Sequence, residues 1–114
     1  MKVYLAGPMS GIPKFNFPAF FAAADRLRAK GHEVFNPAEE DIKRSGNGWW
    51  ENSDGSHRNL PEGITYRECL RHDINWILDH AEAIALLPGW EKSKGVHVEH
   101  ALALALNLPI LDAR

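Results

Sequence analysis

The chain has 114 residues, of which 45% are apolar and 25% charged, and its formal net charge is −2. This length supports one hydrophobic core, so a single domain over residues 1–114 is predicted. The charge balance shows no basic stripe, which argues against nucleic-acid binding. No signal peptide and no apolar run of 18 residues is present, so we expect a cytoplasmic protein without a membrane partner. The lone Cys69 cannot form an internal disulfide, and no Cys/His spacing predicts a metal site.

The N-terminal third predicts a strand, a helix and a second strand. Residues 2–6, KVYLA, are typical of a short buried strand that ends at GPMSG. Apolar residues from Phe17 to Leu27 then recur with helical spacing, Pro18 suits the first helical turn, and Gly31 marks the C-terminal stop. The second strand is expected in HEVFNP, closed by Pro37.

The middle of the chain predicts a long polar loop followed by a helix. Residues 43–63 are polar and rich in glycine, which indicates a surface loop inserted into the domain. Thr65 and Glu68 form a capping-box pattern for a helix that extends to about His80.

The C-terminal third predicts two more strands around a helix. AEAIALLPG (81–89) gives a third strand and residues 108–112 a fourth. The segment 101–106, ALALAL, alternates like a strand, but Ala and Leu are strong helix formers, and we interpret it as helix. Alternating strands and helices predict an α/β fold, a Rossmann-like (flavodoxin-like) three-layer domain with a short, mostly parallel sheet of four or five strands.

In such sheets ligands bind beyond the carboxyl ends of the strands, which directs attention to the loop after the third strand. There Ser93 and Gly95 directly precede a helix, whose free N–H groups and dipole favour an anion, and Lys92 and Lys94 add positive charge. The alternative, that Ser93 and Gly95 only cap and turn the chain, is equally compatible with the spacing.

Two acids border apolar helix faces. Glu99 shares a side with Leu102 and Ala103, four residues or about 6 Å beyond Gly95. That span suits a pentose whose phosphate rests on the helix N-terminus. Asp73 lies beside Leu70 and Ile77 on the preceding helix, where a buried structural acid is the alternative. Most enzymes that cleave a glycosidic bond use a pair of carboxylate side chains.

Three segments together resemble a known family. VYLAGPMSG, RECLRHDINWIL and SKGVHVEHALALALNLPIL are similar to motifs of the nucleoside 2-deoxyribosyltransferase superfamily. The likeness is greatest to its nucleoside 5′-monophosphate N-glycosidases, the 2′-deoxynucleoside 5′-phosphate N-hydrolases and the hydroxymethyl-CMP hydrolases. It covers most of the chain outside residues 43–63, and the small size fits a phage-type member.

The resemblance implies specific roles. Glu99 is expected to be the nucleophile at the anomeric carbon, Asp73 to position and protonate the base, and Tyr4 to orient the nucleophile. The substrate-contacting residues that the resemblance implies are Gly7, Pro8, Met9, Ser10, Gly11, Ser93 and Gly95. It implies hydrolysis of a (deoxy)nucleoside 5′-monophosphate, a pyrimidine such as (hydroxymethyl-)dCMP or CMP, with no cofactor or metal. It also implies a homodimer or larger homo-oligomer.

The resemblance leaves alternatives open. Base exchange by a transferase and a non-catalytic nucleotide-binding module are both compatible with these motifs. In the nucleoside-using transferases an acid commonly occupies the position of Ser93, which favours a monophosphate here. The first loop lacks the family's frequent basic residue, with Lys14 the nearest. Trp49, Trp50 and Trp90 are candidates to stack on a base or, alternatively, to form a lid or a subunit contact.

Overall fold

Four short parallel strands form the middle layer of the domain, as a computed structural model describes it for residues 1–57 and 60–114. Their order in the sheet is β2 (Glu33–Phe35), β1 (Lys2–Ala6), β3 (Ala83–Leu86) and β4 (Ile110–Asp112). After β1 the chain adds β2 on one side of it, and then adds β3 and β4 on the other side. This is the Rossmann-like arrangement that the sequence predicts, with four strands.

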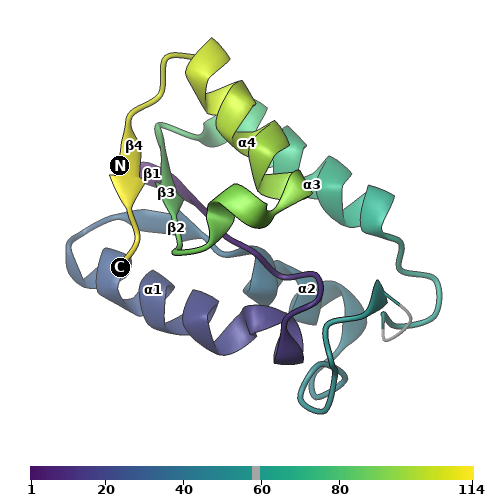
Figure 1. Cartoon of the computed structure of the whole chain (residues 1–114). Helices are drawn as coiled ribbons and strands as arrows, with labels where there is room; N and C mark the ends of the chain where they lie inside the picture. The colour runs from purple at the N-terminus through teal and green to yellow at the C-terminus, as the bar shows by residue number, and fades with distance from the viewer. Residues whose placement is uncertain (58–59) are drawn as a thin grey trace.

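Helices cover both faces of this sheet (Figure 1). The helices α1 (Phe17–Ala29) and α2 (Pro37–Ser45) lie on one face, and α3 (Tyr66–His80) and α4 (Lys94–Ala105) on the other. Short 3-10 turns, η1 (Pro13–Asn16) and η3 (Trp90–Lys92), precede α1 and α4. None of the helices in the described ranges is long and apolar enough to span a bilayer.

Strand alternation divides the core into two layers. Val3 and Leu5 of β1 pack with the α1 and α2 side chains, whereas Tyr4 and Ala6 face the α3 and α4 side. Successive side chains of a strand point to opposite faces, so both faces of the central strands must be apolar. Tyr4 is the exception, because it brings a hydroxyl into the second layer.

The helix α2 corrects the sequence prediction, which placed no helix between the second strand and residue 43, where it began the polar insertion. The Asn36 side chain caps this helix by accepting a hydrogen bond from the Ala38 amide at 3.0 Å. Pro37 occupies the first turn, where its missing N–H costs nothing. Acids in the first turn and bases in the last suit the helix dipole. The loop consequently covers residues 46–65, apart from residues 58–59, which lie outside the described part of the chain.

Other predictions are confirmed. The Thr65 hydroxyl accepts from the Glu68 amide at 3.1 Å and begins α3 at the expected place. The ambiguous ALALAL segment lies in α4 up to Ala105. A strand there would have to displace β4 from the edge of the sheet, where residues 110–112 pair with β3.

Candidate active site

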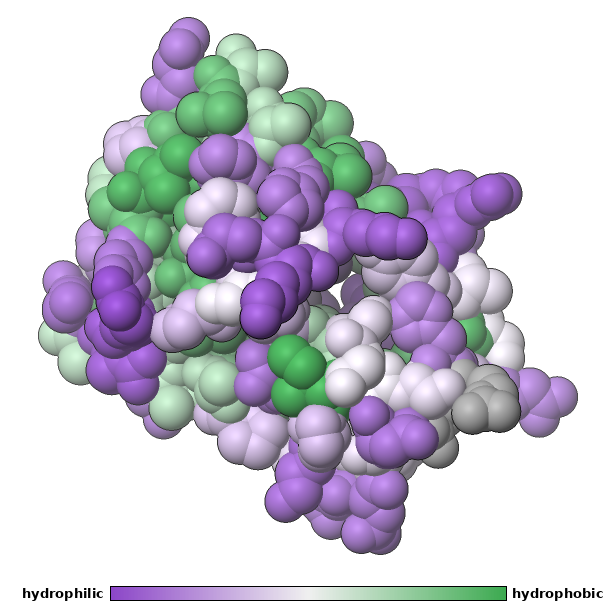
Figure 2. All heavy atoms as spheres, in the orientation of Figure 1, coloured by the Kyte–Doolittle hydropathy of each residue, from purple (hydrophilic) through white to green (hydrophobic). Residues whose placement is uncertain are grey.

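A cavity of about 690 Å³ opens beyond the carboxyl ends of β1 and β3. The chain leaves β1 for β2 on one side and later returns to β3 on the other, so the loops after β1 and β3 separate there. Ligands of open α/β sheets bind at this switch point. The surface is hollowed between the two halves of the molecule in the same view (Figure 2). All the site residues that the sequence singles out line this cavity except Gly11.

Glu99 is buried in the wall of the cavity, with 5% of its surface exposed. It lies on the inner face of α4 with Val96 and Ala103, which are also buried. The Tyr4 hydroxyl donates a hydrogen bond to Glu99 Oε2 at 2.7 Å. This bond fixes the carboxylate and leaves its other oxygen without a partner that the structure records among the described residues. A buried acid held in this way is positioned toward the cavity and not toward solvent.

Asp73 approaches the same point from α3. Its Oδ1 atom is buried and has no hydrogen-bond partner within residues 1–57 and 60–114. Burial, with the nearby Glu99 and Asp41 charges, raises the pKa of Asp73 to about 8. Burial also raises the pKa of Glu99 to about 7, against the opposing effect of the Tyr4 hydrogen bond. The Tyr4 hydroxyl opposes the rise in pKa at both carboxyls, and two interacting acids lose their protons in two steps that belong to the pair.

The N-terminus of α4 forms the adjoining wall. The Ser93 hydroxyl caps the helix by accepting from the Val96 amide at 3.3 Å, which confirms the capping interpretation of that residue. Ser93, Gly95, Lys92 and Lys94 all line the cavity as well. The Tyr66 hydroxyl lies 2.7 Å from where a Cβ on Gly95 would stand. A side chain at this position would displace the end of the Tyr66 side chain, which now contributes a hydroxyl to this end of the cavity.

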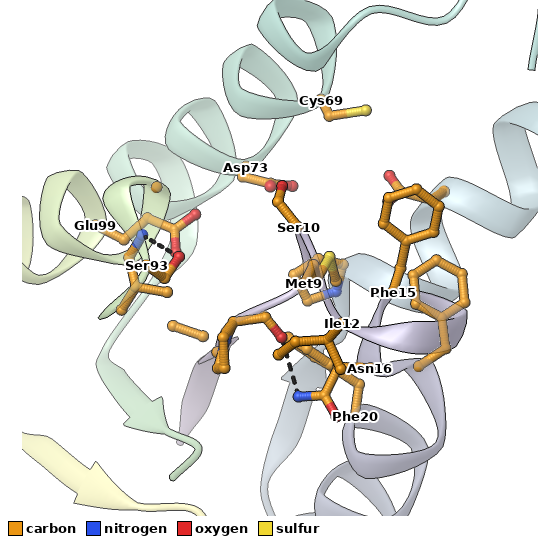
Figure 3. A pocket seen from close by; sticks show the side chains of 18 of the residues that line it. Met9, Ser10, Ile12, Phe15, Asn16, Phe20, Cys69, Asp73, Ser93 and Glu99 are labelled. Atoms are coloured by element: carbon orange, nitrogen blue, oxygen red, sulfur yellow. Dashed lines mark hydrogen bonds between the residues drawn. The ribbon is translucent and has the colours of Figure 1, made fainter. Parts of the chain in front are cut away.

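The loop after β1 supplies the floor with Gly7, Pro8, Met9 and Ser10. Gly11 does not line the cavity. Its amide donates a hydrogen bond to the Gly55 carbonyl at 2.8 Å, which attaches the segment 46–65 to the first-strand loop. Asn16 donates a side-chain hydrogen bond to the Pro8 carbonyl at 2.9 Å (Figure 3). The loop is thus held from both sides.

Three residues of the segment 46–65, Trp49, His57 and Leu60, line the outer side of the cavity. Ser53 accepts at its carbonyl from the Lys14 amide at 2.8 Å, and the His57 ring nitrogen Nε2 lies 2.7 Å from Ser10 Oγ. The same imidazole stacks on the Tyr66 ring with centroids 5.0 Å apart. Sequence reasoning missed His57 and Tyr66, because no local pattern shows that a loop returns across the first-strand loop.

The three tryptophans have separate environments. Trp49 lines the cavity and packs on Phe15 and Phe17, with both centroid distances 5.8 Å. Trp50 packs on Phe17 at 5.2 Å, outside the cavity lining. Trp90 lies against His97 and His100, also outside it. Among these three rings only that of Trp49 belongs to a residue that lines the cavity.

Asp41 is a lining residue that the sequence interpretation did not single out. It is on α2, with 14% of its side chain exposed, and its Oδ1 accepts from Arg44 Nη2 at 2.5 Å. The Cys69 thiol of α3 faces it, and burial raises the pKa of that thiol to about 11. The helix-start pattern Asn36–Pro37 followed by acids could have placed Asp41 one helical turn inside α2. The described residues contain no group of three His, Cys, Asp or Glu side chains that could hold a metal ion.

Fold and cavity together define an α/β Rossmann-like domain with two carboxylates, the buried Glu99 and the half-buried Asp73, in a cavity at the carboxyl edge of its sheet. Over residues 1–112 the chain matches the family described as Domain of unknown function (DUF4406). The chain belongs to this family. No curated protein and no solved structure matches it.

Proposed function

We propose that the protein hydrolyses the N-glycosidic bond of a (deoxy)nucleoside 5′-monophosphate, with Glu99 as the nucleophile. The observation that carries the proposal is the pair formed by the buried Glu99 and the half-buried Asp73 in one cavity, with the Tyr4 hydroxyl on Glu99 at 2.7 Å. The sequence resemblance to nucleotide N-glycosidases assigns the same residues, and a pyrimidine such as CMP, dCMP or a hydroxymethylated form is the proposed substrate.

The raised pKa values of the two acids support a division of labour. A nucleophile must be ionised, and the group that protonates a leaving base must hold a proton. Burial raises the pKa of both acids and the Tyr4 hydroxyl opposes the rise at both, but the neighbouring Glu99 and Asp41 charges add to the rise at Asp73, which reaches about 8 against about 7 for Glu99. At pH 7 to 8 the pair therefore carries one charge and one proton. That is the state in which both roles are possible.

The chemistry proceeds in two steps. A Glu99 carboxylate oxygen attacks C1′ and forms an ester bond, while the C1′–N bond breaks and its electron pair goes to the base. Asp73 gives the departing base its proton. Water then attacks C1′, Asp73 accepts a proton from it, and the ester electron pair returns to Glu99. The products are the free base and the sugar 5-phosphate.

The N-terminal end of α4 is the proposed place of the phosphate. Ser93, Gly95 and the two lysines Lys92 and Lys94 line the cavity there, and Gly95 precedes Glu99 by four residues in the helix. Four residues of helix rise about 6 Å, which places a pentose between an anion at the helix start and the carboxylate. The phosphate then fixes the distance at which C1′ meets Glu99.

A panel of ribo- and deoxyribonucleoside monophosphates, including 5-hydroxymethyl forms, tests the proposal by chromatography of released base. Release of base with sugar phosphate is expected for at least one pyrimidine. Release only when an acceptor base is present would replace hydrolysis by transfer. No release from any substrate, with nucleotide binding retained, would leave a binding module.

Self-association is a further part of the proposal. Val98 and Leu104 on α4, Leu78 on α3 and Ile110 on β4 are exposed apolar side chains. Hydrophobic residues gather over the upper part of the molecule around α4 in Figure 2. We expect sedimentation to show a homodimer or larger assembly that Leu104→Glu weakens, because a carboxylate on this face would be desolvated by a partner.

A further inference from the structure

The cavity has two chemically different ends, and the proposed chemistry occupies only one of them. Figure 3 shows Glu99 and Ser93 at one end, Cys69 and Phe15 toward the other, and Asp73 between them. With the phosphate beside Ser93 and C1′ at Glu99, a base extends past Asp73 toward the second end. The side chains there decide which base fits.

Aromatic rings form the apolar part of this second end. Phe15 is 4% exposed, and its ring lies 5.8 Å from that of Trp49. Both residues line the cavity. Flat faces of this kind accept any base, since every base offers a π surface. They supply affinity without choosing between bases.

Asp41 is the polar group at this end. Its carboxylate lines the cavity, but only 14% of the side chain is exposed, and Oδ1 is already engaged by Arg44 at 2.5 Å. Arg44 and the Cys69 thiol hold the carboxyl in place from α2 and α3. A carboxylate has about four lone-pair sites, and Arg44 and Cys69 occupy two of them, so this fixed group keeps the capacity to accept a further hydrogen bond. Nothing in the proposed phosphate or sugar contacts uses Asp41.

We propose that Asp41 selects bases that present an exocyclic amino group, so that cytosine nucleotides are preferred over uracil nucleotides. The two pyrimidines have nearly the same shape, but cytosine offers an N4 amino donor where uracil offers an O4 acceptor. A carboxylate oxygen accepts from the amino group, whereas it meets O4 acceptor to acceptor in a partly dry site. Leaving buried polar groups unpaired is what makes such discrimination strong. The inference rests on the proposed function for the orientation of the nucleotide.

The test compares CMP with UMP, and dCMP with dUMP, in wild type and in Asp41→Asn. Wild type is expected to favour the cytosine nucleotide by at least about tenfold in kcat/KM. Asp41→Asn keeps the shape but offers an amide that can either donate or accept, so the ratio should fall to about threefold or less. The matched control is Glu40→Gln, because Glu40 is the neighbouring acid of α2, pairs with Lys43 in the same i,i+3 manner and does not line the cavity. It should keep the wild-type ratio.

A binding measurement keeps the two proposals apart. Calorimetric titration of Glu99→Ala with CMP and with UMP reports base preference without turnover, and the same ratio is expected in Kd. Hydrolysis of both nucleotides at equal kcat/KM would overturn the role of Asp41 and leave the proposed function standing. The opposite outcome is no hydrolysis by wild type together with a tenfold preference for CMP in Kd that the Glu99→Ala/Asp41→Asn double variant loses. That outcome would overturn the proposed function and leave the role of Asp41 standing. Equal or undetectable binding of both nucleotides would overturn the inference.

Discussion

The two walls of the cavity are built in different ways. The inner wall takes Tyr4, Asp73 and Glu99 from β1, α3 and α4, whose packing buries Tyr4 and Glu99 to 1% and 5% exposure. The outer wall is the segment 46–65, a run without a regular helix or strand among its described residues. It is attached to residues 10–14 by single hydrogen bonds and to Phe15 and Phe17 by the packing of Trp49 and Trp50. The acidic side chains and Tyr4 thus lie on regular helices and a strand, whereas the outer side of the cavity is formed by a loop. Catalytic geometry should therefore tolerate changes in the loop far better than changes on α3 or α4.

Replacing the nucleophile tests the inner wall most severely. Glu99→Ala should lower turnover at least about a thousandfold, because the covalent step is lost while the remaining cavity still holds the nucleotide. Quenched-flow or chromatographic assay of base release measures this, with calorimetry for binding. The control is Glu91→Ala in η3, an exposed acid outside the cavity lining. Near wild-type turnover in Glu99→Ala would remove the residue from the mechanism.

Asp73 links the inner wall to stability. Its pKa is raised to about 8 in the folded chain, against roughly 4 in an unfolded one, so the folded state holds the extra proton between these values. Stability therefore falls as pH rises from 5 to 8, and Asp73→Asn should remove much of that fall. Relative to wild type, we expect the variant to gain up to about 4 kcal/mol in unfolding free energy between pH 5 and 8, at about 1.4 kcal/mol for each pH unit. Activity should drop in the same variant, because the amide cannot protonate the base.

Urea denaturation at pH 5 and at pH 8 measures the unfolding free energies of wild type and of Asp73→Asn. Asp79→Asn serves as the control, because Asp79 lies on the same helix but is exposed. A parallel pH slope in wild type and Asp73→Asn would show that the carboxyl is hydrated in solution, contrary to the buried position found here.

Ser93 tests where the inner wall holds the phosphate. Asp is as good a helix cap as Ser, so Ser93→Asp should fold, but its carboxylate repels a phosphate dianion at close range. Wild type is expected to prefer a monophosphate over its nucleoside by about tenfold in kcat/KM, or about 1.4 kcal/mol, and the variant to lose that preference. Ser93→Asn is the control, because asparagine is as large as aspartate but carries no charge. Equal use of nucleoside and monophosphate by wild type would instead favour the transferase alternative.

The outer wall is tested by a pair of glycines in the segment 46–65. Gly55 and Gly48 have similar positive φ angles of 87° and 91°, but a Cβ on Gly55 would lie 2.3 Å from the Ile12 carbonyl oxygen, whereas one on Gly48 meets open space. Both alanine variants carry the same backbone strain, so their difference measures the docking contact alone. Gly55→Ala should raise KM about fivefold more than Gly48→Ala, with kcat little changed. If Gly55→Ala lowers kcat instead, the segment 46–65 orients the catalytic acids, and the proposed division between a catalytic inner wall and a covering outer wall is wrong.

The amino-acid sequence by itself determined most of the elements. Helical spacing from Phe17 to Leu27, the Thr65 cap and the run KVYLA predicted α1, α3 and β1 close to their observed limits. The signal is local in each case, because side-chain periodicity and caps act within a few residues. Glu99 and Asp73 were also identifiable, since an acid bordering an apolar helix face is unusual, although their roles came from the family resemblance and stay predictions. The helix α2 was missed although its cap is local, because the polar composition around it outweighed that signal.

Only the tertiary structure decided what these residues meet. The Tyr4–Glu99 hydrogen bond joins positions 95 residues apart, and no local pattern encodes such a distance. The same is true of Asp41 facing Cys69, and of the loop that brings His57 to Ser10. The tertiary structure also placed Trp49 at the cavity and Trp50 outside it, although the two are neighbours in sequence. Packing of α3 and α4 on the same face of the sheet brings the two acids together, and their shared burial raises both pKa values toward neutrality. Proximity and desolvation are properties of the folded chain, so the chemical state of the site could not be predicted from spacing alone.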